Sequence, residues 1–183
     1  MGILSEIKPP FRPIDRPAED EYSPSSSQYI ALVPEDRPVL QQLKENAETI
    51  IKLFHSLPAE KLEYRYAAGK WSLKEVLVHL ADDERIYAYR ALRFARNDPH
   101  QLPGFDQDAF TRYAEAGERP LASILDEYEA VRYATLALYQ GFPAAALTRI
   151  GRTSEFKCSV RGLLYHITGH ELNHLRIIRE KYL

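Results

Sequence analysis

Four long stretches of this chain repeat apolar residues at intervals of three and four, and this periodicity restricts the fold more than any other feature. Such spacing gathers the apolar side chains on one face of an α-helix, and that face must then be buried against other helices. The expected helices begin near residues 35, 72, 120 and 159 and end near residues 57, 96, 141 and 183. No stretch of useful length alternates as a half-buried strand does. The sequence therefore predicts an all-α four-helix bundle.

The expected helix ends carry recognisable signals. Ser72 and Glu75 have the spacing of a capping box, in which each side chain satisfies a backbone donor at the helix start. Pro120 suits the first turn of the third helix, and Gly141 suits its end. Ser159 is expected to cap the last helix. A short helical piece is expected within residues 105–113 of the crossover.

Residues 1–34 differ in composition from the rest of the chain. Six prolines in this stretch prevent regular helix. Phe11, Ile14 and Tyr29 are nevertheless more apolar than a flexible tail requires. We therefore expect two parts: an extended or partly disordered Pro-rich arm, residues 1–34, packed across the bundle, and a bundle domain, residues 35–183.

Composition narrows the range of partners. The net charge of −2 gives no electrostatic case for binding nucleic acid or an anionic membrane. A single cysteine, Cys158, excludes an intrachain disulfide. The first ten residues lack the basic start and apolar core of a signal peptide, so we expect a cytoplasmic protein. Tyr87, Tyr89 and Tyr133 are expected to be exposed and could serve a homodimer interface.

Three of the six histidines, His166, His170 and His174, follow one another at four-residue steps in the last predicted helix. Because a helix turns once every 3.6 residues, neighbouring members of this series share a face and can converge on one ion. His79 can join them if the second and fourth helices face each other. Three neutral imidazoles with an open position have the form of a catalytic zinc site. The alternative is a set of satisfied core or surface histidines, and spacing alone does not choose between the pairs His166/His170 and His170/His174.

Two carboxylates lie near these histidines in the sequence and are candidates for catalysis. Asp83 follows His79 by one turn, and Glu171 is adjacent to His170. Either can orient a ligand or accept a proton. The alternative for the run of three acids at residues 82–84 is a solvated helix face, which we favour.

Two further patterns on these helices concern a row of arginines and a possible di-iron motif. Most of the arginines on the second helix are expected to be exposed charges, with one able to bind a carboxylate near the mouth of a pocket (Arg85, Arg90, Arg93 and Arg96). Glu171 and His174 form one E-x-x-H unit, whereas ferritin-like di-iron bundles use two. A di-iron site is therefore excluded by count.

Three segments, Gly69–Tyr87, Pro103–Asp108 and Tyr165–His174, together resemble the DinB/YfiT-like superfamily. This is a DNA-damage-inducible metalloprotein family, distinct from the DNA polymerase of the same name. The resemblance covers about residues 36–183 and implies a four-helix bundle that holds a divalent metal through three histidines. On this chain it implies that the ligands are His79, His170 and His174. His166 then lines the pocket or supports a ligand from behind.

The resemblance also bears on activity, because the better understood members resemble thiol-dependent S-transferases and isomerases that use mycothiol or bacillithiol. It implies a metal-dependent enzyme that acts on a small molecule, with a low-molecular-weight thiol as the favoured partner. A metal-dependent hydrolase and a non-catalytic metal-binding bundle are the alternatives. Zinc or nickel is the expected ion, and iron, cobalt or manganese are the alternatives. Imidazole ligands suit several of these ions, so the ligands alone do not select one.

Overall fold

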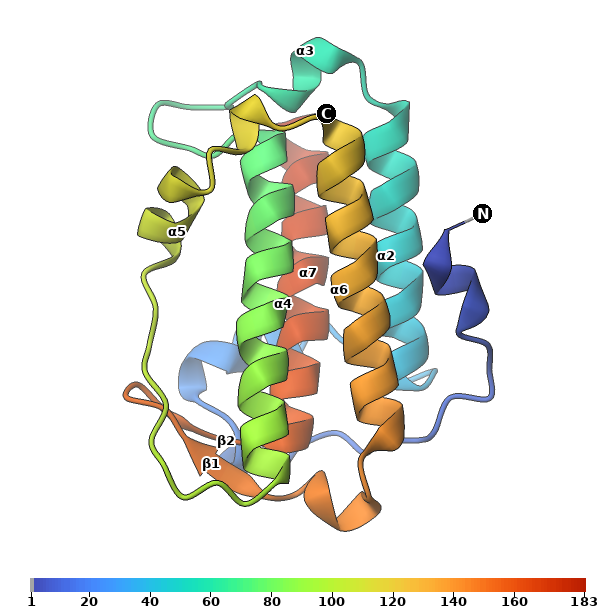
Figure 1. The fold of residues 1–183 in the computed structure, drawn as a ribbon, viewed down its shortest axis with the longest axis vertical. Coiled ribbons are helices and arrows are strands. Elements are labelled where there is room, and N and C mark those ends of the chain that lie inside the picture. Colours follow the sequence, from blue (N-terminus) through green and yellow to red (C-terminus); the bar gives the residue numbers. More distant parts are fainter. Residues whose placement is uncertain (1) are drawn as a thin grey trace.

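Four long helices run side by side along the molecule (Figure 1). They are α2 (Val39–Ser56), α4 (Leu73–Ala95), α6 (Leu121–Gly141) and α7 (Val160–Lys181). The computed structural model describes residues 2–183. Each long helix packs against two others, in the cyclic order α4, α6, α2, α7. The predicted all-α four-helix bundle is confirmed.

The direction of the helices explains the long crossover. Figure 1 shows α2 and α7 running one way and α4 and α6 the other, so that α4 and α6 are parallel neighbours. A connection between parallel neighbours has to return along the whole bundle. Residues 96–120 do so, and they include α5 (Gln107–Tyr113) and the short helix η4 (Ala116–Glu118). The turn between α2 and α4 contains α3 (Ala59–Leu62).

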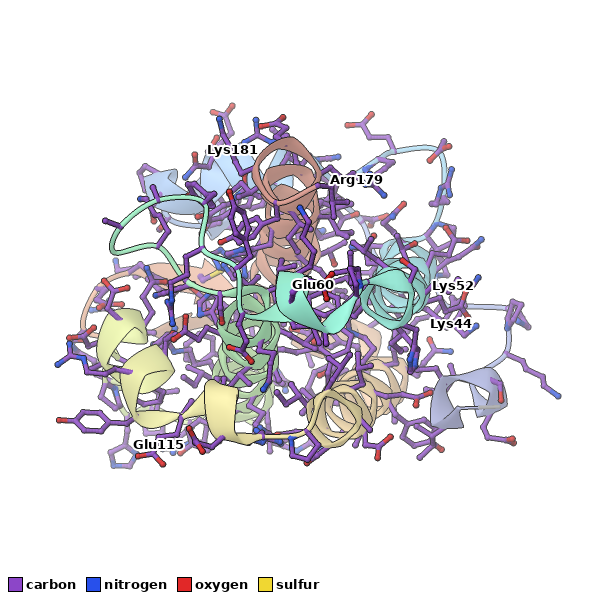
Figure 2. All side chains as sticks on the ribbon, turned by 90° about the horizontal axis from the view of Figure 1, so that it is seen from above. Lys44, Lys52, Glu60, Glu115, Arg179 and Lys181 are labelled. Atoms are coloured by element: carbon purple, nitrogen blue, oxygen red, sulfur yellow. The ribbon has the colours of Figure 1, made fainter. Side chains whose placement is uncertain are left out.

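Charged side chains lie on the outer faces of α2 and α7. Viewed from above, the labelled side chains of Lys44, Lys52 and Arg179 lie on the outside of the bundle (Figure 2). The opposite faces are buried and form one hydrophobic core. Within residues 2–183, no helix combines the length and the apolar character needed to cross a membrane.

Two of the predicted helix caps are confirmed, and one helix start is corrected. The Ser72 hydroxyl accepts the backbone N–H of Glu75 at 3.3 Å, while the Glu75 carboxylate accepts the N–H of Ser72 at 2.6 Å. The Ser159 hydroxyl accepts the N–H of Gly162 at 2.9 Å at the start of α7. The first long helix begins at Val39 rather than near residue 35, because Pro38 has a non-helical ψ of 134° and occupies the cap position.

A small hairpin lies in the connection before α7. Strands β1 (Ile150–Arg152) and β2 (Lys157–Ser159) pair antiparallel, with Gly151 opposite Cys158. Three residues are too few for alternation to be recognised in the sequence. A Cβ at Gly151 would lie 1.9 Å from the Phe94 ring, so glycine lets the hairpin close over the end of α4. The short helix η5 (Ala144–Ala146) leads into β1.

The N-terminal segment wraps around the outside of the bundle. It contains η1 (Ile3–Glu6), η2 (Glu19–Glu21), η3 (Pro24–Ser26) and α1 (Ser27–Ile30). Of these, η1 packs on α6 and α1 packs on α7. A Cβ at Gly169 would lie 1.9 Å from the carbonyl oxygen of Tyr29, so this glycine allows α1 to touch the backbone of α7. Apolar side chains of the segment are buried (Leu4, Phe11, Ile14, Ile30 and Val33). The division of the chain at residue 34 stays a prediction.

A network of charged side chains crosses the core between α4, α6 and α7. The Arg132 guanidinium donates to Glu84 at 2.8 Å and to Glu171 at 2.6 Å. All three side chains are at most 2% exposed. Tyr128 donates its hydroxyl hydrogen to Glu171 as well. The expectation that Glu84 lies on a solvated helix face is therefore wrong.

Candidate metal centre

Helices α4 and α7 bring His79, His170 and His174 together. The Nε2 atom of His170 lies 3.2 Å from Nε2 of His79 and 3.1 Å from Nε2 of His174. One ring nitrogen from each residue lies within 4.8 Å of the other two. His79 and His170 are buried and His174 is half-buried. The cluster combines the i, i+4 pair on α7 with a histidine two turns into α4, where the Ser72 cap fixes the helix start.

The protein environment keeps these imidazoles neutral. Burial, together with the smaller effect of the neighbouring His174, lowers the pKa of His79 to about 3. Burial also lowers the pKa of His174 to about 4. The pKa of His170 falls well below its ordinary value, first because of burial and then because of the surrounding histidines. Neutral imidazoles each offer a lone pair, so three converging Nε2 atoms fit a divalent metal ion.

Asp83 lies behind His170, on the side away from the cluster. Its Oδ2 atom is 3.4 Å from Nδ1 of His170, while Nε2 of the same ring faces the other histidines. Burial raises the pKa of the Asp83 carboxyl to about 7, against the opposing charge of Arg90. A carboxylate behind a histidine fixes the tautomer that leaves Nε2 free to bind a metal. The expectation that Asp83 is solvated is wrong, since its side chain is buried. Asp82 is half-buried.

Glu171 faces the core network rather than the histidine cluster. Its Oε1 atom accepts hydrogen bonds from Arg132 and Tyr128. Its Oε2 atom has no hydrogen-bond partner among residues 2–183. Burial raises the pKa of Glu171, although the charge of Arg132 opposes the shift. Its partners give Glu171 a part in the core, and the structure does not bring it together with the three imidazoles.

His166 lies one turn before His170 and belongs to a different set of contacts. Its ring stacks on Tyr87, with centroids 4.2 Å apart and planes inclined by 4°. Its Nδ1 atom lies 2.9 Å from the hydroxyl oxygen of Ser26. Burial lowers the pKa of His166 to about 3. Tyr87 is 7% exposed, so the expectation that it serves a surface interface is wrong.

Two aromatic side chains enclose the cluster, and sequence reasoning identified neither. The edge of Tyr29 contacts the rings of His166 and His170, at centroid distances of 5.2 and 5.4 Å. Trp71 lies against His79, with centroids 4.7 Å apart. Trp71 directly precedes the Ser72 cap of the helix that carries His79, and this position could have indicated that its ring lies near His79. Tyr29 is distant in sequence from the histidines, and no pattern connects it to them.

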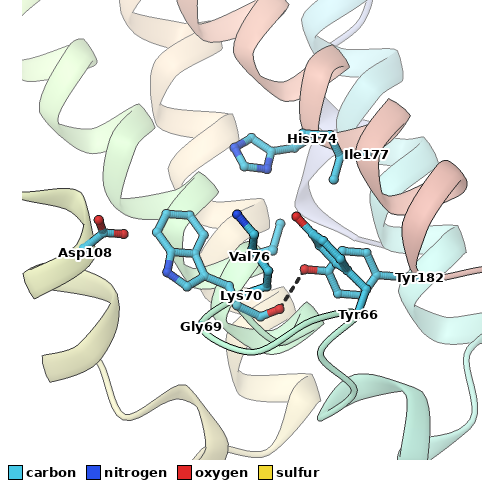
Figure 3. A pocket seen from close by; sticks show the side chains of 9 residues that line it. Tyr66, Gly69, Lys70, Val76, Asp108, His174, Ile177 and Tyr182 are labelled. Atoms are coloured by element: carbon cyan, nitrogen blue, oxygen red, sulfur yellow. Dashed lines mark hydrogen bonds between the residues drawn. The ribbon is translucent and has the colours of Figure 1, made fainter.

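A cavity of about 300 Å³ adjoins the cluster at His174. Figure 3 shows the Lys70 side chain reaching into the space below His174. Asp108 lies at the left of this view, and Ile177 and Tyr182 lie at the right. The Tyr182 hydroxyl donates to the carbonyl oxygen of Trp71 at 2.7 Å and holds one wall in place. The remaining walls are largely aromatic and aliphatic (Tyr66, Trp71, Val76, Ile177 and Tyr182). A small molecule in this cavity would contact the histidine cluster through its His174 side.

Fold and site define a helical-bundle protein whose buried three-histidine cluster is suited to a divalent metal. The sequence model of the DinB superfamily matches residues 42–178, and the chain belongs to this superfamily. Among solved structures, YfiT from Bacillus subtilis has a similar fold, with a TM-score of 0.66 and 16% sequence identity. The alignment covers 91% of this chain and 90% of YfiT, which is described as a probable metal-dependent hydrolase with an unusual four-helix bundle topology. No curated protein gives a significant sequence match.

Proposed function

We propose that the protein binds one divalent metal ion through His79, His170 and His174 and is a metal-dependent enzyme that acts on a small molecule. The observation that carries the proposal is the convergence of three neutral imidazole nitrogens within 4.8 Å of one another beside an open cavity, two on buried histidines and one on half-buried His174. Zinc or nickel is the proposed ion, because both accept imidazole ligands.

The favoured reaction is transfer of a thiol to an electrophile. A bound divalent ion supplies Lewis acidity that lowers the pKa of a thiol or of water. The thiol has to arrive with the substrate, because the sulfur of Cys158 is buried on β2, in contact with η2 and α7 rather than with the cavity. The cavity beside His174 has room for a small substrate.

In this proposal, residues around the cluster orient His170, shield the histidines from water and bind the substrate. The Asp83 carboxylate, 3.4 Å from Nδ1 of His170, favours the tautomer of His170 whose Nε2 lone pair faces the cluster. Trp71 and Tyr29 exclude water from the sides of His79 and His170. Lys70 offers a positive charge at the cavity wall, which favours a substrate with a negatively charged group.

Metal-dependent hydrolysis is the second candidate, and one observation favours it. YfiT, whose fold is similar, is described as a probable hydrolase of this kind. The same three histidines would serve this reaction.

Metal content tests the ligand assignment. Untagged protein purified without chelator is expected to contain about one divalent ion per chain, as a three-histidine site implies. The variants His79→Ala, His170→Ala and His174→Ala should each lose most of it. His166→Ala is the matched control from the same helix face and should retain the ion. Equal loss from His166→Ala would show that the wrong pair on α7 was assigned.

Spectroscopy of the cobalt-loaded protein separates the candidate reactions. Addition of 2-mercaptoethanol should produce a sulfur-to-cobalt charge-transfer band if the site accepts a thiol. An unchanged spectrum together with turnover of an activated ester would favour the hydrolase. A full site that responds to neither probe would support a non-catalytic metal-binding bundle.

A further inference from the structure

Arg90 is a buried cation that has no carboxylate partner. It lies on α4, about three turns beyond His79, and its residue is 2% exposed. Its Nη2 atom donates to the carbonyl oxygen of Pro103 at 3.1 Å. No carboxylate oxygen of residues 2–183 lies within ion-pair distance of its guanidinium group, whereas Arg132, which is as deeply buried, binds Glu84 and Glu171. The same chain thus neutralises one buried arginine and leaves the other without a counter-ion.

Aromatic rings surround Arg90 and hold it in place. Its guanidinium carbon is 5.0 Å from the ring centroid of Tyr87, 5.7 Å from that of Phe105 and 5.4 Å from that of Phe156. Ring faces attract a cation but offer at most weak acceptors, and Pro103 is the only oxygen acceptor of Arg90 among the described residues. The charge of Arg90 lowers the pKa of Asp83, yet that carboxylate lies against His170 instead. Donor capacity therefore remains on Arg90.

A cavity of about 320 Å³ lies beside Arg90, between α4 and the crossover. It shares no lining residue with the cavity next to His174. Arg85 also lines it but is paired with Glu127 and Asp82. The other walls are mainly apolar (Ile86, Tyr89, Leu102, Pro103, Gly104, Phe105 and Phe110). An apolar cavity with one buried, unneutralised guanidinium selects for an apolar molecule with one negative charge.

We propose that this cavity binds a small organic acid, with its carboxylate on Arg90 and its apolar body against Leu102, Phe105 and Phe110. The planar fork of a guanidinium matches a carboxylate with two parallel hydrogen bonds. The ligand supplies the counter-charge that Glu84 and Glu171 supply to Arg132. The site does not depend on the proposed metal function, because it uses none of the three histidines.

The test uses the metal-free, full-length protein with benzoate as the probe and benzamide as its neutral counterpart of the same shape. Two-dimensional NMR of nitrogen-15-labelled protein follows the amide signals of Gly104 and Phe105. Benzoate is expected to shift these signals in a saturable way, and benzamide should bind at least about tenfold more weakly. Equal binding of the two compounds, or benzoate shifts confined to other regions, would overturn the proposal.

Variants then test whether Arg90 is the side chain that binds the carboxylate of benzoate. Arg90→Met should weaken benzoate binding by at least about tenfold, while Arg96→Gln, at the end of α4 and outside the cavity, should leave it within about twofold. If circular dichroism shows that Arg90→Met does not fold, Phe110→Asp serves instead, because Phe110 is exposed and the new charge would repel benzoate but not benzamide. Unchanged benzoate affinity in a folded Arg90→Met protein would show that Arg90 only packs against its aromatic neighbours. Unchanged affinity in Phe110→Asp would show that benzoate does not occupy this cavity.

Discussion

Replacing Arg132 with methionine removes the only cation of the described core network and leaves two carboxylates facing each other. Arg132 shares its single Nε hydrogen between the two Glu84 carboxylate oxygens, at 3.0 and 3.1 Å, and donates further bonds to Glu84 and Glu171 through Nη2. Both acids stay buried in the variant, because their positions on α4 and α7 are fixed by helix packing. We therefore expect Arg132→Met to be strongly destabilising.

The expected size follows from the burial of the network. Removing one partner of a buried ion pair costs about 3–5 kcal/mol, because the other charge is left uncompensated. A domain of this kind has a free energy of unfolding of about 5–15 kcal/mol. With a urea dependence of about 2 kcal/mol per molar, the midpoint should fall by about 2 M.

Urea unfolding of the metal-free protein, followed by circular dichroism at neutral pH, measures this change. The matched control is Arg176→Met on α7, whose pair with Glu180 is exposed and 3.9 Å long, and which should cost less than about 0.5 kcal/mol. Methionine at residues 84, 132 and 171 together should recover most of the loss, since no charged side chain of this network remains. The reasoning is refuted if Arg132→Met destabilises no more than Arg176→Met.

Three further predictions concern single residues and pH. Ser72→Ala should lower the free energy of unfolding by about 1 kcal/mol, because the N–H of Glu75 loses its acceptor; an unchanged melting temperature would contradict the role of the cap. Gly169→Ala should displace α1, because the new Cβ would lie 1.9 Å from the Tyr29 carbonyl oxygen. The control is Gly141→Ala, whose Cβ would meet nothing within 4 Å. Amide exchange at residues 27–30 should rise in Gly169→Ala and stay unchanged in Gly141→Ala. The metal-free protein should lose stability as pH falls from about 6.5 towards 4, because burial lowers the pKa of His79 to about 3 and of His174 to about 4, so the unfolded chain binds more protons than the folded one in this range. A urea midpoint that is the same at about pH 7.5 and about pH 5 would argue against this linkage.

The bundle was predictable because its evidence is local. Apolar periodicity indicates each long helix, and the capping pair Ser72 and Glu75 marks the start of α4 within one residue. Helical pitch places His166, His170 and His174 on one face but does not choose between the pairs His166/His170 and His170/His174, and the family resemblance supplied that choice. Bringing His79 to the same point requires knowing which helices are neighbours, and the family resemblance supplied that information.

The remaining parts of the site depend on contacts between distant segments. Consecutive acids in a helix, such as Asp83 and Glu84, favour the prediction of a solvent-exposed face. The sequence shows that these residues are charged, but it does not show that other helices pack over them. Their burial depends on α6 and α7. Ser26 and His166 are 140 positions apart, and no periodicity connects a short N-terminal turn to the last helix. The same reasoning explains why Arg90 was grouped with exposed arginines.

The two ends of the chain have a consequence for comparing members of the superfamily. The stretch that matches the superfamily, residues 42–178, contains all three histidines of the cluster. Tyr29, which shields His170, precedes this stretch, and Tyr182, which anchors Trp71 at the cavity, follows it. A protein trimmed to the shared stretch would keep the three nitrogen donors and lose part of their enclosure. In this chain, residues outside the shared stretch therefore help to enclose the histidines, and a comparison restricted to that stretch leaves part of the site out.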